Sequence, residues 1–173
     1  MIMNRERTAC FSGYRPHKFD FPLSGNEYDR FTARVYDAIV KIIDEGYVTF
    51  IVGMSAGFDI IAAELVILAK CVYTENEINL ICALPYENFK NTEHFDNHWR
   101  ARYNSVVEQG NKIINVTNEP YWTKGCYGKR NRFMVDNSSL LICYFVGQGG
   151  GTENTIKYAK ERGIRIENIA NSS

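Results

Sequence analysis

Two glycine-containing segments of this sequence have the composition that places backbone amides against a phosphate. Residues 53–57 (Gly-Met-Ser-Ala-Gly) follow one apolar run, and residues 147–152 (Gly-Gln-Gly-Gly-Gly-Thr) follow another. Glycine leaves no Cβ between backbone and ligand, and a helix that starts there offers amides without an intrahelical acceptor. The alternative is that the glycines only form turns and the small residues only cap a helix. We expect a phosphate site whose contacts come from Gly53, Ser55, Ala56, Gly57, Gly149, Gly150, Gly151 and Thr152.

Polar and aromatic side chains near these segments extend the expected site. Residues 12–18 (Ser-Gly-Tyr-Arg-Pro-His-Lys) also follow an apolar run, and the guanidinium of Arg15 suits a bidentate contact with phosphate. An ordinary turn with exposed charges is the alternative for this segment. Asp59 falls in the first turn of a helix, where the macrodipole alone favours a carboxylate and where a ribose hydroxyl is a second partner. The further residues assigned to this site are Ser12 and Gly13, with Tyr14, Glu64, Tyr86 and Arg130 as contacts to the base or ribose.

Two carboxylates are candidates for acid–base chemistry if a bond of the ligand is cleaved. Glu64 lies in an otherwise apolar helical segment, where a carboxylate is costly unless it is paired or faces a cleft, and an exposed helix face is the alternative. Glu153 follows directly on Thr152. Known fingerprints do not fit, because residues 53–58 lack the lysine of a P-loop and no Gly-x-Ser-x-Gly elbow is present. The sequence therefore leaves open whether the protein is an enzyme.

Metal binding is not expected. His94 and His98 are four residues apart, with Glu93 and Asp96 nearby, but no third ligand is evident and a solvated helix start is the alternative. The five cysteines are odd in number, scattered, and lack any Cys-x-x-Cys pair, so they are interpreted as small buried hydrophobic residues.

The composition excludes several classes of protein. The 173 residues include 45% hydrophobic and 23% charged residues at a formal net charge of zero, which is typical of a globular protein and argues against nucleic acid as the main partner. No apolar run approaches the roughly 18 residues that span a bilayer, and residues 1–8 lack the apolar centre of a signal peptide. We expect a single cytoplasmic domain over residues 1–173 with no membrane partner.

Apolar runs and helical periods alternate along the chain. A capping box of Ser24 and Glu27 begins the first helix, and Gly46 ends it. The expected strands are residues 8–12, 48–52, 78–84, 112–116, 140–146 and 164–169. The expected later helices are residues 58–70, 95–109, 129–137 and 152–162, with a loop over residues 117–128.

This alternation predicts an α/β Rossmann-like fold of three layers, with a mostly parallel sheet of five to six strands and helices on both faces. Right-handed connections place the carboxyl ends of all parallel strands on one rim, which is where open α/β sheets bind ligands. The segments that begin at residues 12, 53 and 147 should therefore meet.

Several motifs, in order along almost the whole chain, resemble the YpsA-like proteins of the SLOG superfamily. They are residues 12–16, 53–59 with 62–64, Trp99 with Arg102 and Tyr103, residues 130–136, and residues 149–152. The resemblance implies a Rossmann-like fold that binds a nucleotide or nucleotide-derived ligand, of the nucleoside phosphate or ADP-ribose type, as a sensor or regulatory module.

The same superfamily suggests two other functions. Enzymes of the LOG type, which cleave the N-glycosidic bond of nucleoside monophosphates, have a similar glycine loop, with a catalytic Glu three positions after the Thr. That position is Thr155 here. DprA-like members bind single-stranded DNA and are similar in residues 53–59. Domains of this kind commonly pair through apolar helix faces, so a homodimer is a further expectation.

Overall fold

The computed structural model describes residues 3–93 and 95–171, and within these ranges six strands form one parallel sheet. The order across the sheet is β4-β3-β2-β1-β5-β6, and every neighbouring pair is parallel. The expected parallel sheet is thus confirmed at six strands. The strands are β1 (Thr8–Ser12), β2 (Thr49–Val52), β3 (Asn79–Leu84), β4 (Lys112–Asn115), β5 (Leu140–Cys143) and β6 (Arg165–Asn168).

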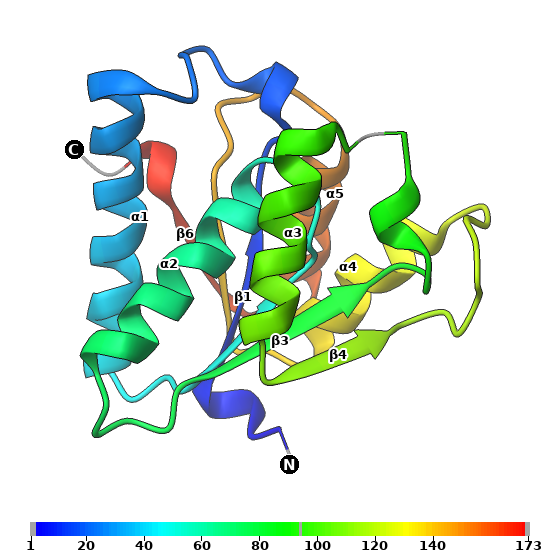
Figure 1. Ribbon diagram of the computed structural model, residues 1–173. Coiled ribbons are helices and arrows are strands. Elements are labelled where there is room, and N and C mark those ends of the chain that lie inside the picture. Colours follow the sequence, from blue (N-terminus) through cyan, green and yellow to red (C-terminus); the bar gives the residue numbers. More distant parts are fainter. Residues whose placement is uncertain (1–2, 94, 172–173) are drawn as a thin grey trace.

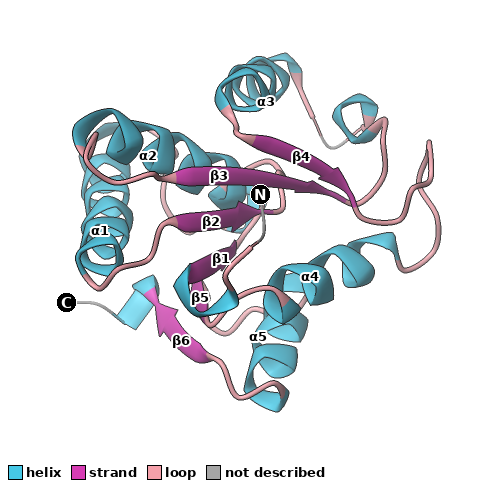
Figure 2. Ribbon diagram, turned by 90° about the horizontal axis from the view of Figure 1, so that it is seen from below, coloured by secondary structure: helices cyan, strands magenta, loops and turns pink. Residues whose placement is uncertain are grey.

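Helices cover both faces of the sheet, which completes the three layers (Figures 1 and 2). One face carries α1 (Gly25–Asp44), α2 (Phe58–Val72) and α3 (Asn97–Gln109), and the other carries α4 (Cys126–Asp136) and α5 (Gly151–Glu161). This division follows from the right-handed connections: the chain moves outward from β1 to β4 and then returns to the opposite side of β1. Along the described ranges, no helix is both long and apolar enough to cross a membrane.

The core is larger and more aromatic on the face of α1, α2 and α3. Phe31 of α1, Phe58 of α2 and Tyr144 after β5 meet there, with ring centroids of Phe31 and Tyr144 4.9 Å apart. Smaller side chains, among them Cys10, fill the opposite face. Burial raises the pKa of the Cys10 thiol to about 12, so this cysteine is an inert packing residue as expected.

Element boundaries differ from the sequence expectations at several places. Ser24 stands at the N-cap of α1, but its side chain makes no capping hydrogen bond. Gly46 lies just past the end of α1, where its amide bonds the carbonyl of Ile43, as expected. Strand β5 ends at Cys143 instead of Val146, because Cys143 pairs with the last residues of both neighbouring strands. Cys71 is exposed, so its interpretation as a buried residue was wrong.

Helix α4 begins at Cys126, three residues before the expected start. Gly125 adopts a left-handed conformation (φ +84°) just before it, and the buried Cys126 side chain anchors the first turn in the core. Two glycines in this stretch made a loop the better expectation, since glycine is a poor helix former.

The strand order places a topological switch between β1 and β5. These strands are neighbours, yet the chain leaves β1 toward one face of the sheet and leaves β5 toward the other. The segments after them diverge and leave a crevice at the carboxyl rim, where open α/β sheets bind ligands. The fold therefore brings the segments after residues 12, 52 and 143 to one place.

Gly13 sits where β1 meets α2. A Cβ atom at this position would overlap the ring of Phe58, the first residue of α2. Gly13→Ala should therefore lower the free energy of unfolding by about 1–3 kcal/mol, the usual cost of overpacking. Gly128→Ala is the matched control: nothing lies near a Cβ there, and alanine should stabilise α4 by about 0.5–1 kcal/mol. Urea unfolding followed by circular dichroism measures both changes, and equal effects of the two variants would contradict this assignment.

Candidate functional site

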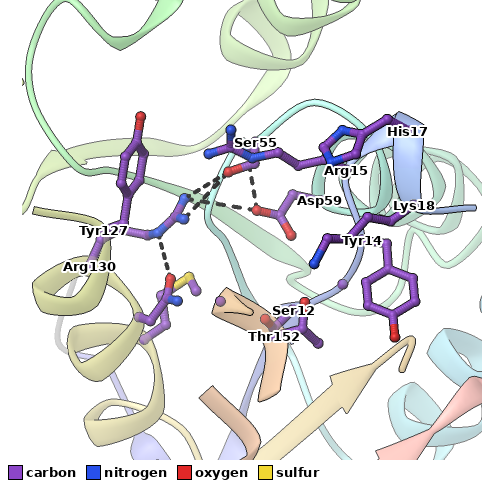
Figure 3. A pocket seen from close by; sticks show the side chains of 14 residues that line it. Ser12, Tyr14, Arg15, His17, Lys18, Ser55, Asp59, Tyr127, Arg130 and Thr152 are labelled. Carbon is purple, nitrogen blue, oxygen red and sulfur yellow. Dashed lines mark hydrogen bonds and ion pairs between the residues drawn. The ribbon is translucent and has the colours of Figure 1, made fainter. Parts of the chain in front are cut away.

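A cavity of about 370 Å³ lies at the carboxyl rim between β1 and β5 (Figure 3). One side of it is lined by Ser12, at the end of β1, and by Gly13, Tyr14, Arg15, His17 and Lys18. Ser55 and Asp59, from the β2–α2 segment, lie across from the N-terminus of α5. The remaining wall comes from α4. The structure thus brings together three segments that the sequence singled out.

The floor of the cavity is a buried pair of opposite charges, Arg130 of α4 and Asp59 of α2. The Arg130 Nη1 lies 3.9 Å from the Asp59 Oδ2, and the two residues are only 5% and 6% exposed. The same guanidinium donates hydrogen bonds to the Gly53 carbonyl, to Ser55 Oγ at 3.4 Å and to Asn131 Oδ1 at 2.8 Å. Asp59 Oδ2 also accepts the Ser55 amide at 3.2 Å. These contacts fix the β2–α2 segment against α4.

Burial shapes the charge of this pair. Desolvation raises the pKa of the Asp59 carboxyl above its usual range, and the nearby Arg130 guanidinium only partly offsets this. Desolvation also lowers the pKa of Arg130, but a guanidinium starts so high that it stays protonated. The floor of the cavity therefore contains a permanent cation beside a carboxylate that gives up its proton reluctantly.

Two of the expected phosphate-binding glycines are required by packing within the protein. A Cβ on Gly53 would overlap the Arg130 guanidinium and the Asp59 carboxylate. Gly57 has φ +96°, and a Cβ there would overlap the backbone carbonyl of Tyr14. Neither glycine lines the cavity, and Ala56 does not either. The atoms that lie close to these two glycines therefore belong to the protein itself.

Tyr14 organises the glycine-rich segment after β5. Its hydroxyl accepts hydrogen bonds from the amides of Val146 and Gln148, both at 3.0 Å. Its ring packs edge-on against Tyr144 and Phe145, and the residue is 2% exposed. This packing leaves little of the ring to stack on a base. Lys18 also holds this segment, with Nζ donating to the Gly149 carbonyl at 2.5 Å.

The N-terminus of α5 opens into the cavity. Gly151 and Thr152, its first two residues, line the wall, and the N-cap residue Gly150 provides no side-chain cap. The first amides of a helix have no acceptor in the helix itself and carry a partial positive charge. Gly149 and Gly150 lie next to this wall without lining it. The arrangement is therefore suited to an anion.

Positive charge dominates the cavity. Arg15 and Lys18 line it, with the Arg15 guanidinium 5.5 Å from the centroid of the Tyr127 ring. Among the described residues, neither cation has a carboxylate within ion-pair distance. Asp59 is the one carboxylate among the lining side chains that the structure describes, and it already faces Arg130. The unbalanced charge favours an anionic ligand.

The structure places three other expected residues outside this cavity. Glu64 of α2 forms a bidentate ion pair with Arg102 of α3 (2.5 and 2.8 Å). Glu153 pairs with Lys157 at 3.1 Å. Tyr86 lines a separate groove. The pairing of Glu64 explains how a carboxylate is accommodated in an apolar helix without facing a cleft.

Part of the α4 wall was not expected from the sequence. Tyr127, Asn131 and Met134 line the cavity together with Arg130. Once α4 begins at Cys126, these positions fall at i, i+3, i+4 and i+7 and share one helix face. The signal was present in the sequence, but starting the helix at residue 129 placed Tyr127 in a loop.

The structure offers no support for a metal site in the ranges it describes, where no group of three or more potential ligands gathers. His94 lies outside the described residues. His98 packs against Trp99 and lies 3.5 Å from the Arg102 Nη1, so its neighbours are aromatic and cationic.

Comparisons with known proteins agree with this architecture. The YpsA family model, described as the YspA SLOG family, matches residues 9–170. The chain is 23% identical over 158 residues to the UPF0398 protein BH1768 of Halalkalibacterium halodurans, which covers 90% of this chain and 82% of that protein.

Two solved structures of DNA processing protein A (DprA) have a similar fold. For the protein from Streptococcus pneumoniae the TM-score is 0.57 at 13% identity, covering 93% of this chain and 49% of that one. For the protein from Helicobacter pylori, whose structure concerns its binding of single-stranded DNA, the TM-score is 0.58 at 15% identity, covering 92% and 63%. This chain thus spans about half of one DprA chain and less than two thirds of the other.

The raised pKa of Asp59 predicts a pH dependence of stability. The folded state holds the Asp59 proton more tightly than the unfolded chain, so this group favours folding at low pH. That contribution is present below the unfolded pKa near 4 and is lost as pH rises through the folded pKa.

Relative to Asp59→Asn, the wild type should lose up to about 1.4 kcal/mol of unfolding free energy per pH unit in this window. Urea unfolding of both proteins between pH 4 and pH 8 measures the difference. A wild type that instead gains stability relative to the variant would show that Arg130 lowers the Asp59 pKa.

Proposed function

This chain belongs to the YspA SLOG family, and from that premise we propose that its rim cavity binds the phosphate of a nucleotide or nucleotide-derived ligand. One observation carries the proposal. The N-terminus of α5 and two cations without carboxylate partners among the described residues, Arg15 and Lys18, face the same cavity at the switch between β1 and β5. Helix amides, the macrodipole and a guanidinium are the groups that recognise phosphate in proteins.

The phosphate and the ribose of the ligand each have a counterpart in the cavity. The phosphate lies on the amides of Gly151 and Thr152, and Arg15 and Lys18 neutralise its charge. Asp59 uses Oδ2 for the Ser55 amide, and Oδ1 remains to accept a ribose hydroxyl. Arg130 serves mainly to hold Asp59 and Ser55 in place, because its nitrogen atoms already donate to protein acceptors.

The positions of the candidate acids support binding over hydrolysis. Glu64 and Glu153 are both in ion pairs and neither lines the cavity. Thr155 stands where LOG-type enzymes have their catalytic Glu. Its buried hydroxyl accepts the Asn131 side-chain amide at 2.8 Å and donates to the Gly151 carbonyl at 2.9 Å. These groups position the first turn of α5, and none of them is placed to protonate a leaving group.

Single-stranded DNA is the second candidate ligand, because the DprA structures share this fold. A DNA strand needs a series of cations along its backbone, and affinity then falls steeply with salt. The formal net charge of zero and the position of Arg15 and Lys18 in the same cavity favour the single nucleotide.

Titration calorimetry with a panel of nucleoside mono- and diphosphates, ADP-ribose and NAD tests the proposal. At least one ligand should bind, and Arg15→Ala and Lys18→Ala should each weaken that binding about tenfold, because each removes a charge-assisted contact. Lys129→Ala is the matched control. It removes an exposed cation of α4 that does not line the cavity, and it should leave the affinity unchanged.

Two results would contradict the proposal. The first is the absence of binding for every member of the panel at millimolar concentration. The second is a loss of affinity in Lys129→Ala as large as in Arg15→Ala, which would indicate attraction to the overall surface charge and no defined phosphate site.

A further inference from the structure

A second hollow adjoins the cavity on the side of β3 and β4. It is a groove of about 610 Å³, and four of its lining residues are aromatic: Tyr86, Tyr121, Trp122 and Tyr127. Tyr86 follows β3, Tyr121 and Trp122 lie in the segment between β4 and α4, and Tyr127 belongs to α4. All of them lie beyond the carboxyl ends of the strands, on the same rim as the cavity.

Hydrogen bonds hold the two segments that form the groove against each other. The amide of Glu87 donates to the Glu119 carbonyl at 2.9 Å. The backbone and side-chain amides of Asn88 both donate to the Pro120 carbonyl, at 3.1 and 2.9 Å. Tyr121 and Trp122 follow directly on this clamp, so the groove is a formed feature of the fold.

Tyr121 and Trp122 are far more exposed than an aromatic side chain of the core, at 70% and 58%. Leaving rings of this size in water forgoes the free energy of their burial, and neighbouring exposed apolar groups mark sites of interaction. Tyr86, by contrast, is buried against Phe89 and Tyr127 and forms the floor of the groove.

One ring separates the groove from the cavity. Tyr127 lines both hollows, with Arg15 over its ring on the cavity side. A ligand whose phosphate lies in the cavity therefore reaches the groove by passing a single side chain.

The charges of the two hollows differ. Arg15, Lys18 and Arg130 line the cavity, whereas Glu93 is the one charged side chain among the described residues that line the groove. An uncharged, planar group suits aromatic walls without cations, and the side-chain amide of Asn91 offers a donor and an acceptor for its edge.

We propose that the groove formed by Tyr86, Asn91, Tyr121, Trp122 and Tyr127 is the subsite for the base of the nucleotide. The base stacks on Trp122 or Tyr121, and the phosphate of the same nucleotide lies across Tyr127 on the N-terminus of α5.

This inference rests on the proposed function and deepens it. It also gives Tyr86 and Tyr14 different positions: Tyr86 lies under the base, and Tyr14 supports the segment next to the phosphate. The occupant is a small nucleotide, because the described residues that line the groove include no cation to continue along a polynucleotide backbone.

Calorimetry with two kinds of probe tests the subsite. Inorganic pyrophosphate reports on the cavity alone, and the four nucleoside diphosphates ADP, GDP, CDP and UDP report on cavity and groove together. Trp122→Ala should weaken the best nucleoside diphosphate about tenfold or more and leave pyrophosphate unchanged, since base–aromatic stacking is lost on truncation. Trp122→Phe should retain most of the affinity. Leu68→Ala, which truncates an exposed apolar side chain of α2, is the matched control and should change neither.

The outcomes separate the two proposals. If neither pyrophosphate nor any nucleoside diphosphate binds, the proposed function fails and the subsite fails with it. If both kinds of probe bind and Trp122→Ala and Tyr121→Ala, singly and combined, leave the nucleoside diphosphates unaffected, the phosphate site stands and the base subsite is wrong. If an oligothymidylate binds more tightly than every nucleoside diphosphate, with steep salt dependence, the occupant is a DNA strand and the small-nucleotide proposal is overturned.

Discussion

A buried guanidinium connects the two faces of the sheet at the site. Arg130 comes from α4 on one face, and it contacts the Gly53 carbonyl and Asp59 of α2 on the other. Because both charged groups are removed from water, either one alone would be destabilising, so the pair is stable only when α4 and the β2–α2 segment take these positions. The requirement extends along α4: Tyr127 stands one turn before Arg130, and Asn131 supports the start of α5 through Thr155. The wall of the cavity thus follows from a single electrostatic contact.

A buried tyrosine hydroxyl sets the opposite wall. The Tyr14 hydroxyl binds two amides of the segment after β5, so the glycine-rich chain runs along a fixed path into α5. Gly13, Gly53 and Gly57 allow the chain to pack closely against itself. The glycines before α5 instead leave the N-terminus of that helix open to a ligand. Similar sequence patterns therefore have two different physical causes in one site.

The fold was largely predictable from the sequence, because continuous apolar strands alternating with helical periods can bury both faces only in a parallel sheet. The rim location of the site followed from that topology. Contacts between distant residues did not follow. The partner of Glu64 lies 38 positions away at Arg102, and nothing in the local sequence distinguishes a paired carboxylate from a catalytic one. The need for glycine at Gly13 and Gly53 depends on Phe58, Arg130 and Asp59, whose positions only the tertiary structure shows. The face of α4 was missed because Gly125 and Gly128 made its first turn look like a loop.

In the proposed site, the first amides of α5 bind a phosphate. A titration of the ¹⁵N-labelled protein with inorganic pyrophosphate, followed by nuclear magnetic resonance of the assigned backbone amides, tests this contact residue by residue. We expect the largest chemical-shift changes at Gly151 and Thr152, together with a change at Arg15 Nε. The first amides of α3, a helix start capped by Asp96, serve as the control and should not change. Shifts spread evenly over exposed lysines and arginines, with Gly151 and Thr152 unchanged, would contradict the proposed contact.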